Sequence, residues 1–309
     1  MHKPANLFFM GKGGVGKSTS SALYSVYLAE KGFKVLMVSL DPAHNQSDIF
    51  RKSFSDKPMQ VTHAFSVIEV DQDKWIKAYL KEIQHQVNRT YSYLTAFNLE
   101  NYFKVIKHSP GLEEYALILA FNHIQHNFSD YDYLIFDMAP TALSLKFFNL
   151  PVLSLIWIEQ LLTLRQEIIK KGEMITKIKL IKKEIERDKV LNKISEMKND
   201  FQTLKTAFEN SDRTRVQLVL NPDELSLAES IRIFQGLKDI NIDVNQIVYN
   251  KKQNSSAGDE LNKAFGKTPT IHFPYSETPL IGYDVLKQYL NSNDRLVEKQ
   301  LDRMLMPSV

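Results

Sequence analysis

A glycine-rich stretch, residues 11–18, carries residue types that bind phosphate. It reads GKGGVGKS and matches G-x-x-x-x-G-K-[ST], between the apolar run Leu7–Met10 and a helical pattern that ends near Gly32. Glycines let the backbone N–H groups of such a loop turn toward phosphate oxygens, and the helix N-terminus adds its partial positive charge. Lys17 is expected to neutralise the β- and γ-phosphates, and Ser18 to ligate Mg²⁺. The sequence therefore predicts an ATP site formed by Gly11, Gly13, Gly14, Val15, Gly16, Lys17, Ser18 and Thr19.

Two aspartates follow apolar runs, where strands are predicted to end. Asp41 comes shortly after Val35–Val38, and Asp137 closes the run Tyr133–Phe136. Because ligands of open parallel sheets bind beside the carboxyl ends of the strands, Asp41 is expected to polarise a water or hold Mg²⁺, and Asp137 to bind the shell of that ion. Acids also end strands as ordinary turn formers, but the nearby phosphate loop favours the metal interpretation. The predicted metal site is formed by Ser18, Asp41 and Asp137.

The elements that must position these residues alternate between short apolar runs and helical patterns. The apolar runs are Leu7–Met10, Val35–Val38, Val67–Val70, Tyr133–Phe136, Val216–Leu220 and Ile247–Tyr249. Continuous apolar strands separated by helices are typical of a parallel sheet covered on both faces. The expected fold class is therefore α/β, a doubly wound and mostly parallel sheet of the P-loop NTPase type.

Two segments, 73–109 and 151–212, interrupt this alternation with long helical patterns. We expect both to form a helical subdomain inserted into the nucleotide-binding domain, which would comprise 1–72, 110–150 and 213–309. The apolar positions of 151–212 repeat at spacings of four and three. They suit either a surface for another molecule or packing inside the subdomain.

The composition narrows the class of protein further. The 309 residues are 43% hydrophobic and 24% charged, which fits a globular chain of one or two domains. A net charge of +3 is too small to indicate a nucleic acid partner. The absence of cysteine excludes disulfides, iron–sulfur clusters and thiolate zinc sites. No run reaches the ~18 consecutive apolar residues of a membrane span, so a cytoplasmic location is expected.

Several segments together resemble a known family. GKGGVGKST, SLDPAHNQSDIF, SPGLEEYALILAF, FDMAPTALSLKFFNLP and NPDELSLAES resemble, in order and spacing, the arsenite-pump ATPase (ArsA) family, which includes the ATPase of the guided-entry pathway for tail-anchored membrane proteins. The resemblance implies a P-loop domain that bears a helical subdomain, and a dimer that closes over two ATP molecules. The loop is similar to the deviant Walker A motif, in which the first lysine, here Lys12, reaches the nucleotide of the partner subunit.

The resemblance also implies roles for individual residues. Asp41 would orient the attacking water in the first switch, defined here as residues 41–48, and Asp137 would open the second switch, residues 137–144. Asn250 falls where the family holds the adenine ring, and Asp223 falls where an acid contacts the partner's nucleoside. Pro274 lies in a stretch similar to the loop that closes over adenine. Without the family, ordinary turn chemistry explains Asn250, Asp223 and Pro274 equally well.

The second switch departs from the family pattern. Met138, Ala142, Leu143 and Ser144 stand where the family has Thr, Gly, His and Thr. Metalloid-stimulated activity is not expected, because soft As(III) favours thiolate ligands and the chain has no cysteine. The paired CxxC of the eukaryotic targeting members is also missing, so no zinc is expected.

Two main hypotheses follow for the function. The first is a homodimeric Mg²⁺-ATPase whose helical subdomain receives a hydrophobic client such as a transmembrane helix. The alternative is a regulatory or transport-coupled ATPase that energises a membrane partner and has no hydrophobic client. A module that binds ATP without hydrolysing it is a third interpretation, suggested by the altered second switch.

Two minor features remain open at this level. His123 and His126 lie three apart on a predicted helix and suit either a solvated face or metal ligation. The C-terminal apolar pattern from Leu296 to Leu305 suits either a closing core helix or an amphipathic membrane anchor.

Overall fold

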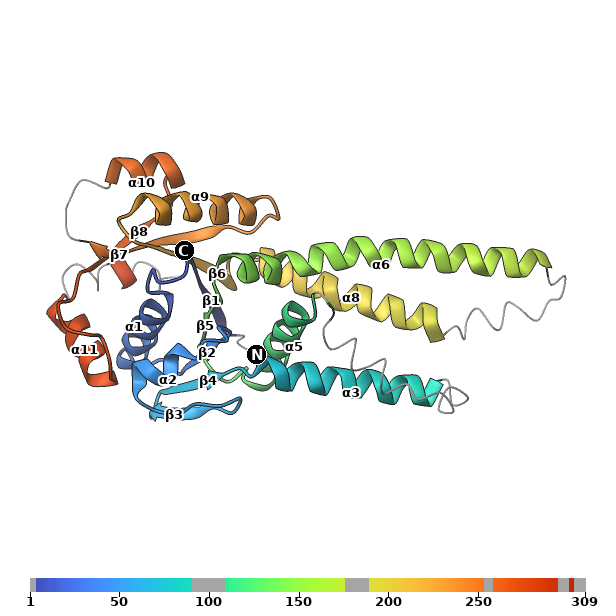
Figure 1. The fold of residues 1–309 in the computed structure, drawn as a ribbon, viewed down its shortest axis with the longest axis horizontal. Helices are drawn as coiled ribbons and strands as arrows, with labels where there is room; N and C mark the ends of the chain where they lie inside the picture. Colours follow the sequence, from blue (N-terminus) through green and yellow to red (C-terminus); the bar gives the residue numbers. More distant parts are fainter. Residues whose placement is uncertain are drawn as a thin grey trace. The chain divides into compact units, whose positions relative to one another are not determined.

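Figure 1 shows the fold in a computed structural model, which describes residues 4–90, 109, 111–175, 189–252, 258–293 and 300–302. The strands are β1 (Ala5–Met10), β2 (Val35–Ser39), β3 (Met59–Thr62), β4 (Phe65–Glu69), β5 (Tyr133–Asp137), β6 (Thr214–Leu220), β7 (Val244–Lys252) and β8 (Thr270–Pro274). The helices are α1 (Lys17–Glu30), α2 (Asn45–Phe50), α3 (Gln72–Thr90), α5 (Leu112–Asn127), α6 (Thr141–Ile175), α8 (Lys189–Glu209), α9 (Glu224–Lys238), α10 (Gly258–Phe265) and α11 (Tyr283–Ser292).

Within the described residues, the strands form an eight-stranded sheet in the order β3-β4-β2-β5-β1-β6-β7-β8. β3 is antiparallel to β4, and the other neighbouring strands are parallel. The predicted α/β class with a mostly parallel sheet is confirmed, and each predicted apolar run contributes to a strand. β3 and β8 were not predicted, because β3 is largely exposed and neither strand carries a continuous apolar run.

The sheet is buried by helices on both faces. α1 and α11 pack on one face, against alternating strand residues such as Leu7, Phe9 and Met37. On the other face Phe8 stacks on Phe136 of the neighbouring strand, with ring centroids 4.7 Å apart. Phe121 of α5 and Phe147 near the start of α6 complete this aromatic cluster. Burial on both faces explains why the central strands are apolar throughout, as expected for a parallel sheet.

The chain divides into two compact units. Unit 1 consists of Met1–Phe147 and Ser211–Val309, and unit 2 of Phe148–Asn210. The chain leaves unit 1 inside α6, just before Pro151, whose ring removes the helical hydrogen bond to the carbonyl of Phe147. α3, which we expected in the helical subdomain, lies in unit 1 and packs on α5. The subdomain assignment of 73–109 and 151–212 stays a prediction, since 91–108, 110 and 176–188 lie outside the described residues.

Among the residues that the structure describes, one helix is long and apolar enough to cross a membrane. By length and composition alone, Thr141–Lys170 in α6 meets that criterion, and the core helices of soluble proteins meet it too. Meeting this criterion is therefore not sufficient to identify α6 as a membrane-spanning helix. The predicted C-terminal amphipathic pattern falls largely on 294–299 and 303–309, outside the described residues.

The aromatic cluster gives a prediction about stability. Phe121→Ala should lower the free energy of unfolding by about 3–5 kcal/mol, because it leaves a cavity among three other phenylalanine rings. Urea unfolding monitored by circular dichroism measures the change. The matched control is Met59→Ala on the exposed edge strand, which should cost less than about 1 kcal/mol. A loss for Phe121→Ala no larger than that of the control would contradict this packing.

Candidate active site

The phosphate loop joins β1 to α1 and depends on glycine at two close approaches. Gly11 has φ 152°, and a Cβ there would lie 2.3 Å from the carbonyl oxygen of Val219. Gly16 caps α1 with φ 94°, and a Cβ there would lie 2.3 Å from Nδ2 of Asn250. A side chain at either position would both strain the backbone and collide with a neighbour. The loop therefore holds its shape only with the glycines that the motif supplies.

Lys17 is a buried cation at the start of α1. Its side chain is 5% exposed, and Nζ donates a hydrogen bond of 3.2 Å to the backbone carbonyl of Lys12 within the same loop. Burial lowers the pKa of Lys17, while the negative charges of Asp137 and Asp41 oppose this shift. A desolvated ammonium beside a helix N-terminus is an attractive place for the anionic phosphates of a nucleotide.

Asp137 is a fully buried acid at the carboxyl end of β5. Its Oδ2 accepts a hydrogen bond of 2.8 Å from Nε2 of Gln46, while Oδ1 has no hydrogen-bond partner among the described residues. Burial raises the pKa of Asp137 to about 6, and hydrogen bonds from Gln46 and Ser18 act in the opposite direction. An unpartnered carboxylate oxygen near a serine hydroxyl offers the hard oxygen ligands that Mg²⁺ prefers.

The metal interpretation does not require a larger acidic cluster. The part of the chain that the structure describes contains no group of three or more His, Asp or Glu side chains arranged to hold a metal. Mg²⁺ in nucleotide sites is commonly bound by one or two protein groups, with phosphates and waters as its other ligands. Ser18 and Asp137 fit that pattern.

Asp41 opens the first switch and is 6% exposed. Its Oδ1 accepts a hydrogen bond of 3.0 Å from the backbone N–H of Ala43, which folds the switch back on itself. His44 then adopts a left-handed conformation, φ 50°, and α2 begins at the next residue. Asp41 therefore lies on a tight turn, at the sheet edge where the phosphate loop also begins.

Glu69 fixes the start of α2 from a neighbouring strand. It is buried at the end of β4 and accepts hydrogen bonds from the backbone N–H of Ser47, at 2.8 Å, and from its hydroxyl, at 2.7 Å. A carboxylate that accepts N–H groups in the first turn of a helix stabilises that turn. Glu69 was not predicted as a site residue, although it is the last residue of β4 just as Asp137 is the last residue of β5.

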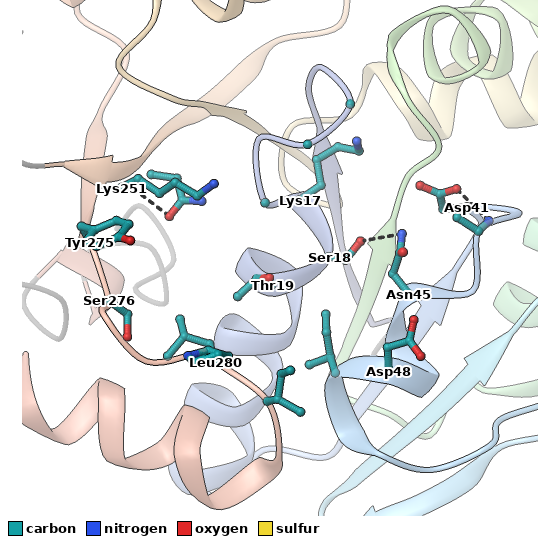
Figure 2. Close-up of a pocket in the computed structure, with 18 of the residues that line it drawn as sticks. Lys17, Ser18, Thr19, Asp41, Asn45, Asp48, Lys251, Tyr275, Ser276 and Leu280 are labelled. Atoms are coloured by element: carbon teal, nitrogen blue, oxygen red, sulfur yellow. Dashed lines mark hydrogen bonds between the residues drawn. The ribbon is translucent and has the colours of Figure 1, made fainter.

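A cavity of about 640 Å³ opens beside the phosphate loop, which is within the usual range for small-molecule sites. In Figure 2 the side chains of Ser18 and Asn45 point toward one another in its lining, and Asn45 Nδ2 donates a hydrogen bond of 3.5 Å to Ser18 Oγ. The predicted residues that line it are Gly13, Gly14, Gly16, Lys17, Ser18, Thr19, Asp41, Asn250 and Pro274. The other lining residues were not predicted individually, although some of them lie in the two switches and in the stretch around Pro274; they are Ala43, Asn45, Asp48, Ile49, Pro140, Lys251, Tyr275, Ser276, Thr278, Pro279, Leu280 and Ile281.

Five predicted residues do not line this cavity. They are Gly11, Lys12, Val15, Asp137 and Asp223. Gly11 and Val15 belong to the loop backbone, and Asp137 lies beneath the surface of the site. Asp223 is exposed and caps α9, where its Oδ1 accepts a hydrogen bond of 2.7 Å from the backbone N–H of Ser226. Its contact with a partner's nucleoside stays a prediction.

The two residues expected at the adenine ring already have partners in the protein. Asn250 donates from Nδ2 to the carbonyl of Val15 at 2.8 Å and accepts from the N–H of Lys251 at 2.9 Å. The carbonyl of Pro274 accepts from the hydroxyl of Tyr289 at 2.7 Å. Asn250 therefore braces the phosphate loop, and its contact with adenine, like that of Pro274, stays a prediction.

The second switch runs directly into α6. Met138 and Ala139 are buried, and the hydroxyl of Ser144 donates to the carbonyl of Ala139. α6 begins at Thr141, whose hydroxyl donates to Glu229 of α9. Alanine favours a helix by about 1 kcal/mol over glycine, so Ala142 stabilises the first turn at the position where the family has glycine. Ala142 is thus a better helix former than the glycine that the resemblance implies at this position.

Together the glycine loop, the buried lysine and the strand-end acids define a P-loop protein that binds nucleoside triphosphates. The family model for anion-transporting ATPases matches residues 5–265, and the chain belongs to this ArsA family. As a member of this family, it is an ATPase that hydrolyses ATP to ADP and phosphate.

Similar proteins carry related names. A protein provisionally named arsenical pump-driving ATPase 2, from Aquifex aeolicus, is 28% identical over 91% of this chain and 96% of its own length. An ATPase ASNA1 homolog from Entamoeba histolytica is 31% identical over 79% of this chain and 75% of its own length. ATPase ASNA1 homolog 1 from Paramecium tetraurelia is 25% identical over 92% of this chain and 90% of its own length.

The buried acid gives a prediction that links stability to pH. Because the pKa of Asp137 is raised in the folded protein, the folded state binds its proton more tightly than the unfolded state does. The contribution of Asp137 to folding stability is then most favourable below its unfolded pKa and becomes less favourable as the pH rises toward about 6. Asp137→Asn should therefore stabilise the nucleotide-free protein at pH 7, by up to about 3 kcal/mol for a two-unit shift in pKa.

Urea unfolding of the parent and of Asp137→Asn at pH 7 and pH 5 checks this expectation. The stability difference should shrink at the lower pH, and ATP hydrolysis by the variant should fall. The exposed substitution Asp200→Asn serves as the control and should change stability by less than about 0.5 kcal/mol at either pH. A variant less stable than the parent at pH 7 would show that the ionised carboxylate is stabilising.

Proposed function

We propose that this ATPase is a Mg²⁺-dependent cytoplasmic homodimer that holds a hydrophobic segment of a membrane protein and releases it on ATP hydrolysis. The observation that carries the proposal is an exposed apolar stripe on α6 in unit 2. The names of the ASNA1 homologs describe ATPases only, so the client is inferred from this surface and from the resemblance to the tail-anchored-protein targeting ATPase.

The α6 stripe consists of large apolar side chains that water reaches. It includes Trp157, 70% exposed, and its members are Leu153, Ile156, Trp157, Leu161, Leu164 and Ile168. Their spacing of three and four places them on one side of the helix. The opposite side of α6 carries Leu155 and Ile158, which are buried. The helix is therefore apolar on two sides, and in the described part of the chain one of them is packed while the other is exposed.

α8 shows the same division along its length. Phe201, Leu204 and Phe208 in its second half are buried, whereas Val190 and Met197 in its first half are exposed. The apolar positions predicted for 151–212 are thus partly buried inside unit 2 and partly exposed, as far as the described residues show. Contiguous exposed apolar surface of this kind marks interaction sites in soluble proteins, since its burial against a partner is favourable. An apolar helix is a suitable occupant.

A direct connection joins the nucleotide site to this stripe. Asp137 opens the second switch, and α6, which carries the stripe, begins at Thr141 within that switch. Loops that contact a γ-phosphate rearrange when it is lost, and a helix that begins in such a loop is displaced with it. ATP hydrolysis would therefore change the presentation of the α6 stripe.

Lys12 supports the dimer. Its carbonyl is used by Lys17, and its partly exposed side chain is not among those that line the cavity of its own chain. A lysine supplied to the partner's nucleotide would act like an arginine finger. Lys12→Ala is expected to reduce ATP turnover by about 10³-fold while each subunit still binds ATP. Single-turnover hydrolysis and equilibrium nucleotide binding measure the two effects, and turnover within twofold of the parent would exclude this role.

The client proposal is tested by capture of a fluorescently labelled transmembrane-helix peptide. Asp41→Asn, which should bind ATP and hydrolyse it slowly, is incubated with the peptide and Mg-ATP or ADP. Capture should depend on the nucleotide and should fail for a scrambled polar peptide. Capture that ignores the nucleotide or the hydrophobicity of the peptide would contradict the proposal.

Variants of the stripe sharpen this test. Leu161→Ser with Leu164→Ser should lower peptide affinity at least tenfold, since each exposed leucine contributes roughly 1.5–2 kcal/mol when it is buried. Leu225→Ser, a change at an exposed leucine in unit 1, is the matched control and should retain capture. If the parent binds ATP but captures no peptide with either Mg-ATP or ADP, the result would favour the alternative, an ATPase that energises a membrane partner.

A further inference from the structure

Gln46 links three parts of the active site through one buried amide. It is the second residue of α2 and is fully buried. Its Nε2 lies 2.8 Å from Oδ2 of Asp137 and 3.2 Å from the backbone carbonyl of Ser18. The two hydrogens of this amide therefore connect the first switch to the end of β5 and to the first turn of α1.

The bond to Asp137 is the stronger of the two. A hydrogen bond to an ionised carboxylate is about twice as strong as one between neutral groups. Only these two hydrogen bonds offset the desolvation cost of the buried amide, because Oε1 of Gln46 has no partner among the described residues. A fully apolar side chain would fill the same space without that desolvation cost. The amide is thus better explained by what it does to Asp137 than by packing.

The orientation of Asp137 follows from this contact. With Oδ2 held by Gln46, Oδ1 is the oxygen left without a protein partner in the described part of the chain. A carboxylate that is hydrogen-bonded on one oxygen keeps the other available to a cation, which is how residues behind a metal ligand commonly orient it. Ser18 and Asp137 are the two groups that we expect at Mg²⁺.

We propose that Gln46 is a positioning residue for the metal–nucleotide complex. Its amide holds the Asp137 carboxylate in place and connects the first switch to the first turn of α1 at Ser18. This role rests on the Mg²⁺ dependence in the proposed function. Gln46 touches neither nucleotide nor metal in this role and acts through Asp137. Loss of its amide should weaken the contribution of Mg²⁺ to nucleotide binding more than nucleotide binding itself.

The test is the affinity for a fluorescent ATP analogue, with Mg²⁺ and with EDTA. We define the Mg²⁺ gain as the ratio of the affinity with Mg²⁺ to the affinity in EDTA. For Gln46→Leu, the affinity in EDTA should stay within about twofold of the parent. The Mg²⁺ gain should fall about tenfold or more, as expected for a lost hydrogen bond to a charged group. The Mg²⁺ concentration for half-maximal ATP hydrolysis should rise in parallel. Gln46→Glu keeps the length of the side chain but replaces the donor with a second carboxylate beside Asp137, so its Mg²⁺ gain should fall further than that of Gln46→Leu.

Gln217→Leu is the matched control. Gln217 is a fully buried glutamine in β6, and neither atom of its amide has a partner within the described residues. This substitution should leave the Mg²⁺ gain unchanged. If Gln46→Leu does not fold, Gln46→Met keeps the volume of the side chain, lacks the donor and carries the same expectation.

The outcomes separate the two levels of the proposal. A Mg²⁺ gain that survives in folded Gln46→Leu would overturn the role of Gln46 and leave the metal dependence of the ATPase intact. No Mg²⁺ gain in the unsubstituted protein would overturn the metal dependence itself, and the positioning role with it.

Discussion

Three charged side chains held away from water determine how the rest of unit 1 is built. Lys17, Asp41 and Asp137 follow β1, β2 and β5, which are neighbours in the sheet, and each is less than 10% exposed. Burial of a charge is costly unless opposite charges and hydrogen bonds accompany it. Their mutual attraction supplies part of this compensation, as the opposing effects on the pKa of Lys17 and Asp137 show.

The surrounding structure brings these charges together and holds them there. Parallel pairing aligns the carboxyl ends of β2, β5 and β1, so residues far apart in sequence meet at one edge. The glycines of the phosphate loop allow the chain to wrap around Lys17. Glu69 fixes the first turn of α2 behind the first switch.

The local parts of the site were predictable from the sequence, because each is formed by residues that are consecutive in the chain. The phosphate loop needs its glycines, Lys17 and Ser18 in a fixed order, and Asp137 directly ends an apolar strand. Gln46 could not be found in this way, since its partner lies 91 positions away and contact depends on the register of the fold. The edge strand β3 also escaped prediction, because its four residues alternate between apolar and polar side chains and form no continuous apolar run.

The helical unit illustrates a different limit of sequence patterns. Apolar residues at spacings of three and four look the same whether they face a core or a surface. Only the fold distinguishes Ile158, which is buried, from Trp157 beside it, which is exposed. The sequence left the use of 151–212 open between packing and client binding, and α6 and α8 show that the apolar positions are divided between a packed side and an open one.

The burial of Lys17 bears on how long the chain survives in the cell. Lys17 Nζ donates to the backbone carbonyl of Lys12, a neutral group, whereas a bound triphosphate would supply several negative charges. A ligand that binds only the folded state adds about 2.7 kcal/mol to its stability at one hundred times its dissociation constant. A newly synthesised chain would thus gain resistance to proteases by capturing ATP.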